Sequence, residues 1–258
     1  MTGPGTATPA TRTETAVAAS PLDQFRITPL IPVQLGDVDA SFTNSSLFMV
    51  LAVLGVTLLM MAATRRHALV PGRWQSMAEL LYEFVAGMVR DNVGSEGRKY
   101  FPIIFSIFTF ILFGNLLGMI PYSFTFTSHI IVTFALAMLV FIGVTLIGLA
   151  RHGFHFLSFF VPQGVPVLLL PLMIPIEIIS YLSRPISLSI RLFANMMAGH
   201  TMLKVFAGFV VSLGVIGGWA PLAVASALVA FEFLIAFLQA YVFAILTCLY
   251  LNDAIHLH

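Results

Sequence analysis

The side chains that could do chemistry in this chain are a few charged residues set inside long apolar segments. From Tyr100 onward there are only seven charged residues. An ionisable group at membrane depth costs roughly 2.5–3.5 kcal/mol on insertion scales, and such groups usually face a partner or a water-filled path. The charges that fall within apolar helical pattern are therefore the first candidates for a functional site. They are Glu177, Arg184, Arg191, Lys204 and Glu232.

Three of these charges belong to a polar stripe along one predicted helix. Steps of three and four residues keep side chains on one helical face, with a drift of only ~20° per heptad. The stripe either forms a buried seam within the chain, with Glu177 pairing Arg184, or faces a partner or an ion path. Three charges in an otherwise uncharged region favour the second interpretation. Its members are Glu177, Ser180, Arg184, Ser187, Arg191 and Asn195.

No acidic residue lies three or four positions from Arg191. A guanidinium keeps its proton at any accessible pH, so the pattern indicates an anion from outside the helix. His200 lies nine residues further on, about 180° around the helix, and we expect it to face another element such as the last helix. There Glu232 and Gln239 are seven residues apart and share a face. Because an imidazole and a carboxylate in a water-accessible cleft can pass protons near neutral pH, these four residues together favour proton handling.

The composition places these residues in a membrane protein. Apolar types make up 59% of the 258 residues and charged types 9%, with a mean hydropathy of +0.99, whereas an average globular protein has about 25% charged residues. The formal net charge of +1 does not support nucleic-acid binding. The single cysteine, Cys248, offers neither a disulfide nor a zinc site. No Gly-rich phosphate loop occurs, so we expect no metal and no cofactor.

The hydropathy pattern predicts an all-α polytopic fold, because a spanning helix needs about 20 apolar residues. One segment is too long for this rule: at ~1.5 Å per residue, a single helix over about 168–214 would measure about 70 Å. Either Pro185 divides that segment into two spans, or it lies strongly tilted. The clean apolar stretches are about 46–63, 101–120, 129–150 and 221–251.

Two other segments are less apolar. Apolar residues recur at helical spacing over 71–93, with charges between them, which suits an amphipathic helix in the membrane interface better than a span. A helix packed against the other helices is an equal alternative. Residues 1–40, which begin with a Thr-, Ala- and Pro-rich stretch lacking the apolar core of a secretory signal, are expected to form a flexible segment. A single membrane domain would follow over 41–258.

Basic residues near the helix ends predict the orientation. With five spans they lie on one side, which the positive-inside rule makes cytoplasmic, or matrix in a mitochondrion. The C-terminus then returns to this side. Six spans would move only the C-terminus across, so the pattern leaves the even or odd count open. The basic residues are Arg65, Arg66, Arg73, Arg90, Arg98, Lys99 and Arg151.

Several motifs closely resemble the signature of subunit a of F-type ATP synthases. The longest is Ser189–His200, with the sequence SIRLFANMMAGH. The opening Pro21–Phe25 looks like the start of related chains, and the resemblance extends to about Leu251. The other matching motifs are Gly114–Pro121, Pro175–Glu177, Ser183–Pro185 and Leu238–Phe243.

This resemblance implies five spanning helices plus a surface helix, with the last two helices forming a long tilted hairpin around a ring of c subunits. It implies that Arg191 faces the ring carboxylates, with Gln239 near it and Asn195 one turn away. His200 and Glu232 match positions that line an aqueous half-channel. Many bacterial relatives carry this acid and imidazole in the opposite order, whereas the order here resembles mitochondrial and alphaproteobacterial chains. Which of the two titrates stays open.

The function implied is that of a proton-translocating stator subunit of the rotary ATP synthase, with Arg191 separating two aqueous half-channels. Glu177 joins the proton path, and Arg184 and Ser187 are secondary candidates. The expected partners are the c-ring, the peripheral-stalk b subunits, other ATP synthase membrane subunits and lipid. Nucleotide chemistry would belong to other subunits. The expected location is the bacterial inner membrane, with the mitochondrial inner membrane as the alternative.

A secondary transporter with its own intramembrane ion site is the rival class of protein. Such transporters are typically built from internal repeats with paired broken helices. The sequence contains no such repeat, and its polar residues concentrate in the second half. A purely structural membrane anchor would leave Arg191 and the polar stripe without a role.

Overall fold

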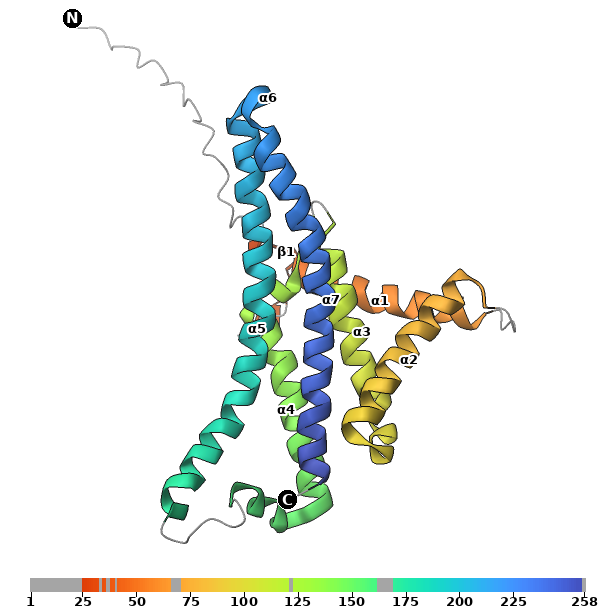
Figure 1. Cartoon of the computed structure of the whole chain (residues 1–258), viewed down its shortest axis with the longest axis vertical. Helices are drawn as coiled ribbons and strands as arrows, with labels where there is room; N and C mark the ends of the chain where they lie inside the picture. The colour runs from red at the N-terminus through yellow and green to blue at the C-terminus, as the bar shows by residue number, and fades with distance from the viewer. Residues whose placement is uncertain are drawn as a thin grey trace, which may run out of the picture.

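Long helices make up most of the described chain, as the sequence predicts (Figure 1). A computed structural model describes residues 25–32, 34–35, 38–39, 41–65, 71–120, 123–161 and 169–256. The α-helices are α1 (Asn44–Thr64), α2 (Arg73–Val93), α3 (Phe101–Gly118), α4 (Ile130–His152), α5 (Leu170–Ser212), α6 (Gly214–Gly217) and α7 (Trp219–Ile255). Three short 3-10 segments connect them: η2 (Ser95–Lys99), η3 (Phe126–Ser128) and η4 (Gly153–Phe160).

Two antiparallel strand pairs precede the first helix, a feature that the hydropathy pattern did not predict. The pairs are β1 (Pro29–Ile31) with β4 (Phe42–Thr43), and β2 (Gln34–Leu35) with β3 (Val38–Asp39). The flexible segment expected over 1–40 falls mostly on residues outside the described ones. Its described part is this pair of small ribbons.

Four of the described helices are long and apolar enough to cross a membrane, namely α1, α3, α4 and α7. Each coincides with a span predicted from the sequence. The helix α2 is not among them. It buries Val85, Met88 and Val89 on one face, which packs against α7, α1 and α3, and it exposes Glu83 and Arg90 on the other. It is therefore amphipathic and also packed against the other helices.

The long helix α5 runs unbroken through Pro175 and Pro185, so Pro185 does not divide it into two spans. A proline inside a helix removes a backbone hydrogen bond and costs about 3 kcal/mol. Close packing of Tyr181, Leu188 and Leu192 in the core offsets that cost, since packing contacts drive the association of helices in a membrane. The polytopic all-α fold predicted from the sequence is confirmed, with the segment containing both prolines as a single element.

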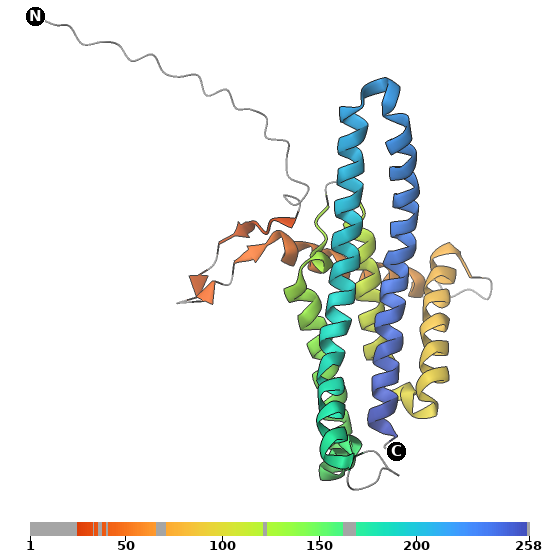
Figure 2. The same ribbon diagram turned by 60° about the vertical axis from the view of Figure 1, so that its left-hand side comes forward.

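The helices α5 and α7 form a long antiparallel hairpin that α6 closes (Figures 1 and 2). Its 43-residue arm α5 would be about 65 Å long at ~1.5 Å per residue, about twice the thickness of a bilayer core. In both views α1 crosses this hairpin at a steep angle.

The turn of the hairpin depends on two glycines. Gly214 has φ +63°, in the left-handed region that disfavours other residues. A Cβ at Gly218 would lie 2.6 Å from the carbonyl oxygen of Gly214. The sequence predicts that the last helix begins at about Pro221, whereas in the structure it begins at Trp219. Pro221 still lies in the first turn, where backbone amides have no partner within the helix.

The core lies where α3 and α4 pack against the N-terminal half of α5 and the C-terminal half of α7. Its fully buried side chains include Phe108, Ile111, Met196 and Phe243. The outer faces of the helices remain apolar, and Ile131 is 77% exposed. Exposed apolar surface on this scale is what a lipid environment requires.

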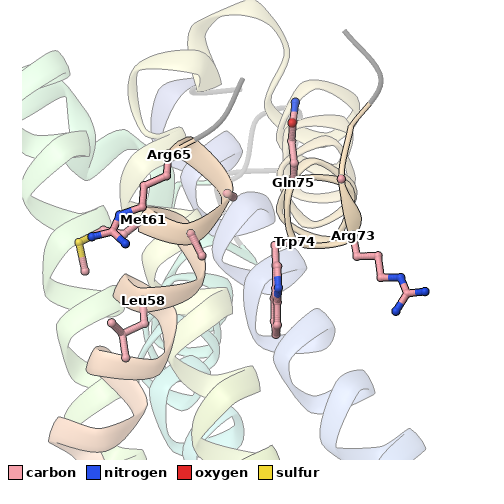
Figure 3. Close-up of a pocket in the computed structure, with 9 residues that line it drawn as sticks. Leu58, Met61, Arg65, Arg73, Trp74 and Gln75 are labelled. Carbon is pink, nitrogen blue, oxygen red and sulfur yellow. The ribbon is translucent and has the colours of Figure 1, made fainter. Parts of the chain in front are cut away.

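A cavity of about 530 Å³ opens between the end of α1 and the start of α2 (Figure 3). Leu58, Met61 and Trp74 give it a mainly apolar lining, and Arg65 and Arg73 point away from one another. No residue of the predicted proton path lines this cavity. The predicted site residues lie on α5 and α7 instead.

Candidate functional site

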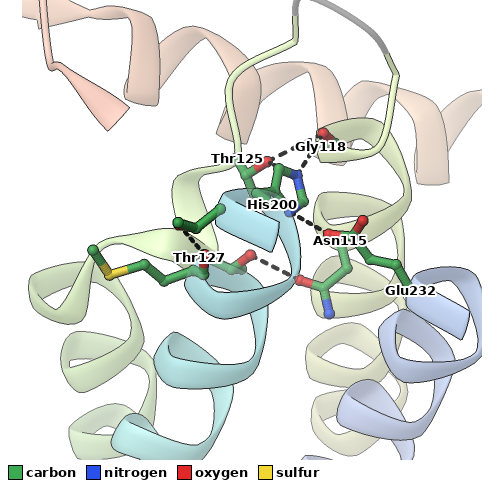
Figure 4. Close-up of polar contacts among 8 residues, drawn as sticks. Asn115, Gly118, Thr125, Thr127, His200 and Glu232 are labelled. Atoms are coloured by element: carbon green, nitrogen blue, oxygen red, sulfur yellow. Dashed lines mark hydrogen bonds and ion pairs between the residues drawn. The ribbon is translucent and has the colours of Figure 1, made fainter. Parts of the chain in front are cut away.

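His200 of α5 and Glu232 of α7 form a buried ion pair between the two arms of the hairpin (Figure 4). The contact joins His200 Nδ1 to Glu232 Oε1, and the two side chains are only 11% and 4% exposed. Gly199 makes this approach possible, since a Cβ there would lie 2.8 Å from Glu232 Oε1. His200 faces the last helix, away from Arg191, as its spacing along α5 predicts.

The other ring nitrogen of His200 contacts the connection between α3 and α4. His200 Nε2 lies 3.0 Å from the carbonyl oxygen of Gly118 and 2.8 Å from Thr125 Oγ1. The Thr125 hydroxyl also donates to the Gly118 carbonyl, at 3.2 Å. These contacts to the Thr125 hydroxyl and the Gly118 carbonyl fix the orientation of the imidazole ring.

The short contact between His200 Nδ1 and Glu232 Oε1 needs one proton between the two atoms, carried either by the imidazole or by the carboxyl group. Glu232 Oε2 is buried and has no hydrogen-bond partner among the described residues. An unsatisfied buried carboxylate oxygen costs free energy, so this atom is suited to take a water molecule or a proton.

Asn115 continues the polar network into the core (Figure 4). Its Oδ1 accepts from the Thr127 hydroxyl at 2.8 Å, and its Nδ2 donates to the carbonyl oxygen of Ala236 at 3.3 Å. Both polar side chains are fully buried. Ala236 lies one turn after Glu232 on α7, so these bonds connect α3 and η3 to α7 next to the His200–Glu232 pair.

Arg191 lies on the exposed face of α5. It forms no ion pair or hydrogen bond with any residue in the described ranges. Ser187, one turn before it, is also exposed, and Asn195, one turn after it, is partly buried. A guanidinium within an apolar segment is costly without a counter-charge. Its charge is therefore not balanced by any residue that the structure describes.

The remaining residues of the predicted site are spread along the hairpin. Gln239 is buried on α7, on the same face as Glu232, and forms no hydrogen bond with Arg191 within the described structure. Glu177 is partly buried near the start of α5. Arg184 pairs with Asp253 of α7, with 3.0 Å between Arg184 Nη1 and Asp253 Oδ2. The structure therefore pairs Arg184 with Asp253 and not with Glu177, the partner considered from the sequence.

The sequence pattern does not identify Thr125, Gly118 or Asp253 as site residues. Thr125 lies in a connection without helical periodicity, and Asp253 follows the last apolar stretch. One signal was available for Gly118, because its motif contains two glycines and a proline around Asn115. In the described ranges no group of three or more His, Cys, Asp or Glu residues could hold a metal ion.

We expect Gly199→Val to destabilise the protein by about 1–3 kcal/mol, because the larger side chain would displace Glu232 from His200. Stability is measured by thermal unfolding of the purified protein in detergent. Gly143→Val in α4 is the control, since nothing lies within 4 Å of an added Cβ there. Equal effects of the two substitutions would contradict the role of Gly199.

The fold and the site together define a class: an integral membrane protein whose hairpin carries a buried imidazole–carboxylate pair and an exposed cation. Residues 46–252 match the ATP synthase A chain family. The chain is 61% identical to ATP synthase subunit a of Paramagnetospirillum magneticum, over 93% of this chain and 100% of that protein. It is 63% identical to that of Rhodospirillum rubrum, over 93% and 99%, and 58% identical to that of Pelagibacter ubique, over 94% and 100%.

The chain therefore belongs to the ATP synthase subunit a family. It is a membrane subunit of an ATP synthase, and its partners include other subunits of that complex.

Proposed function

We propose that this chain is the proton-translocating stator subunit of a rotary ATP synthase, with two aqueous half-channels that lead to and from the carboxylates of a c-ring. One observation carries the proposal. The buried His200–Glu232 pair faces the inside of the hairpin, while Arg191, on the same helix α5, is exposed on another face. In such a path the His200–Glu232 pair would carry the proton on one face of α5. Arg191 would meet the mobile ring carboxylate on the other face.

The His200–Glu232 pair would act as the proton relay of one half-channel. Thr125, His200 and Glu232 are joined in series by short polar contacts, so a proton can pass along them with small atomic movements. Glu232 Oε2 is the end of this series that lacks a hydrogen-bond partner among the described residues. Water reaching this oxygen would complete the path. Gln239, two turns along α7, would continue the polar face.

Arg191 would separate the two half-channels. Its charge attracts a deprotonated ring carboxylate and repels a hydrated proton that tries to pass directly between the channels. Asn195 and Ser187, one turn to either side, would line the contact with the ring, and Glu177 would belong to the path near the start of α5. The driving force is about 2.3 kcal/mol per charge for each 100 mV of membrane potential.

Peripheral-stalk b subunits are the further partners that we propose, and the bacterial inner membrane is the proposed location. The bacterial origin of the relatives supports this location. Large apolar side chains exposed on the outer faces of α1 and α4, such as Leu58 and Leu139, are suited to lipid and to the helices of neighbouring subunits. Nucleotide chemistry would take place in other subunits of the complex.

Cysteine crosslinking to a c subunit tests the proposal. We expect Ser187→Cys and Ala194→Cys, both on exposed positions of α5, to crosslink to a cysteine placed beside the ring carboxylate. Leu146→Cys is the matched control, since this residue is 58% exposed on α4. The background should be low because Cys248, the single native cysteine, is buried. Crosslinks at Leu146 but not on α5 would overturn the proposed ring-facing surface.

A further inference from the structure

Arg184, the second arginine of the polar stripe, forms an ion pair within the chain. Arg184 precedes Arg191 by seven residues, about 10 Å along the helix axis and ~20° around it. Its Nη1 lies 3.0 Å from Asp253 Oδ2 in the last turn of α7, and the two side chains are 19% and 35% exposed. The two arginines thus share one face of α5, but only Arg184 has an acidic partner among the described residues.

Two tyrosine rings contact the guanidinium of Arg184. The guanidinium carbon of Arg184 lies 4.8 Å from the ring centroid of Tyr250 and 5.2 Å from that of Tyr181, within the range of cation–π attraction. The Tyr181 hydroxyl in turn lies 2.7 Å from Thr145 Oγ1 on α4. Three helices therefore hold Arg184 in one position, beside the acid that balances its charge.

The pair is close enough to influence the surroundings of Arg191. If Asp253 lost its charge, the stripe would present two positive charges about 10 Å apart. The remaining cation of α5, Lys204, lies about 140° around the helix from Arg191, so it does not belong to this face.

We propose that Asp253 is a positioning residue for proton transfer. It balances the charge of Arg184, so that Arg191 is the cation of this pair of arginines that remains available to a ring carboxylate. Without Asp253, Arg184 competes for the same carboxylate, which lowers the rate at which the carboxylate leaves the stripe. The inference rests on the proposed function, because it assumes that a mobile carboxylate passes along this face.

Charge-removing substitutions in the complete ATP synthase test this inference. We expect Asp253→Asn to lower ATP-driven proton pumping in membrane vesicles by about tenfold, within the range of measured coupling between neighbouring charges. Adding Arg184→Gln to that variant should recover most of the lost pumping, and Asp253→Glu should retain pumping. Asp91→Asn is the matched control, because this residue forms an exposed ion pair with Arg90 at 3.7 Å, where the loss should be small.

The double variant distinguishes charge balance from a simple structural tie. A tie between α5 and α7 would be lost equally in Asp253→Asn, in Arg184→Gln and in the double variant, and equal impairment of all three would overturn the inference. Undiminished pumping by Asp253→Asn would overturn it as well. If Asp253→Asn does not assemble, the double variant decides: recovered pumping supports charge balance, and impaired pumping rejects it.

The proposed function has a separate outcome in the same assay. Normal pumping by Arg191→Ala would reject the function itself. Loss of pumping in Arg191→Ala together with an unaffected Asp253→Asn would reject only the role of Asp253.

Discussion

Replacing Arg191 by alanine is expected to reduce ATP-driven proton pumping to background and to increase passive proton leak through the membrane. The guanidinium is exposed and has no acidic partner among the described residues, so its charge is available to an external carboxylate. Without that charge the ring carboxylate loses its attraction to the stator, and a hydrated proton loses the barrier between the half-channels. Pumping and leak are measured in the same membrane vesicles, with and without ATP.

Two comparisons make this prediction specific. Arg73→Ala removes an exposed arginine at the start of α2 and should leave pumping unchanged. Arg191→Lys preserves a charge, but an ammonium can lose its proton when buried and lacks the planar fork of a guanidinium, so we expect only partial pumping. Coupled pumping at the normal rate in Arg191→Ala would reject the separating role of this residue.

The second large effect is expected at the His200–Glu232 pair. Glu232→Gln keeps the shape of the side chain but removes the acid that shares a proton with His200. Positioned proton-transfer groups typically contribute 10²–10⁴-fold to a rate, so we expect pumping to fall by roughly 10²-fold. His200→Ala should have a similar effect. The rate is measured across a range of pH, because loss of the pair should also change the pH profile.

Non-additivity is the more specific signature of this pair. Since the imidazole and the carboxylate share one proton, the variant lacking both groups should be little worse than either single variant. Glu79→Gln on α2 is the control, because Glu79 is exposed and bonds only to Gln75 on its own helix at 2.8 Å. Wild-type pumping in both Glu232→Gln and His200→Ala would remove these residues from the proton path.

The surroundings of the pair suggest why it tolerates its burial. One imidazole nitrogen bonds to a backbone carbonyl and a hydroxyl, and the other bonds to a carboxylate. A buried charge is stabilised when it is paired and hydrogen-bonded. Glu232 Oε2 is buried and has no hydrogen-bond partner among the described residues, which is why we propose it as the point of proton exchange.

The sequence by itself determined the class of protein, the positions of the helices and the faces on which the polar residues lie. These features depend on local physics: apolar runs must match the bilayer, and the helical repeat fixes which residues share a face. The spacing of nine residues between Arg191 and His200 was enough to place them on opposite sides of α5. Periodicity also identified Glu232 and Gln239 as one face of the last helix.

The tertiary structure decided which polar groups meet. Arg184 pairs with Asp253 rather than with Glu177, because seven residues separate side chains by about 10 Å along a helix, whereas the register of the hairpin brings α7 alongside. Thr125 and Gly118 reach His200 from a connection that has no helical repeat to reveal its direction. The local sequence likewise could not decide whether α5 continues through Pro185. A proline destabilises a helix, and whether the helix continues depends on packing against residues that are distant in the sequence.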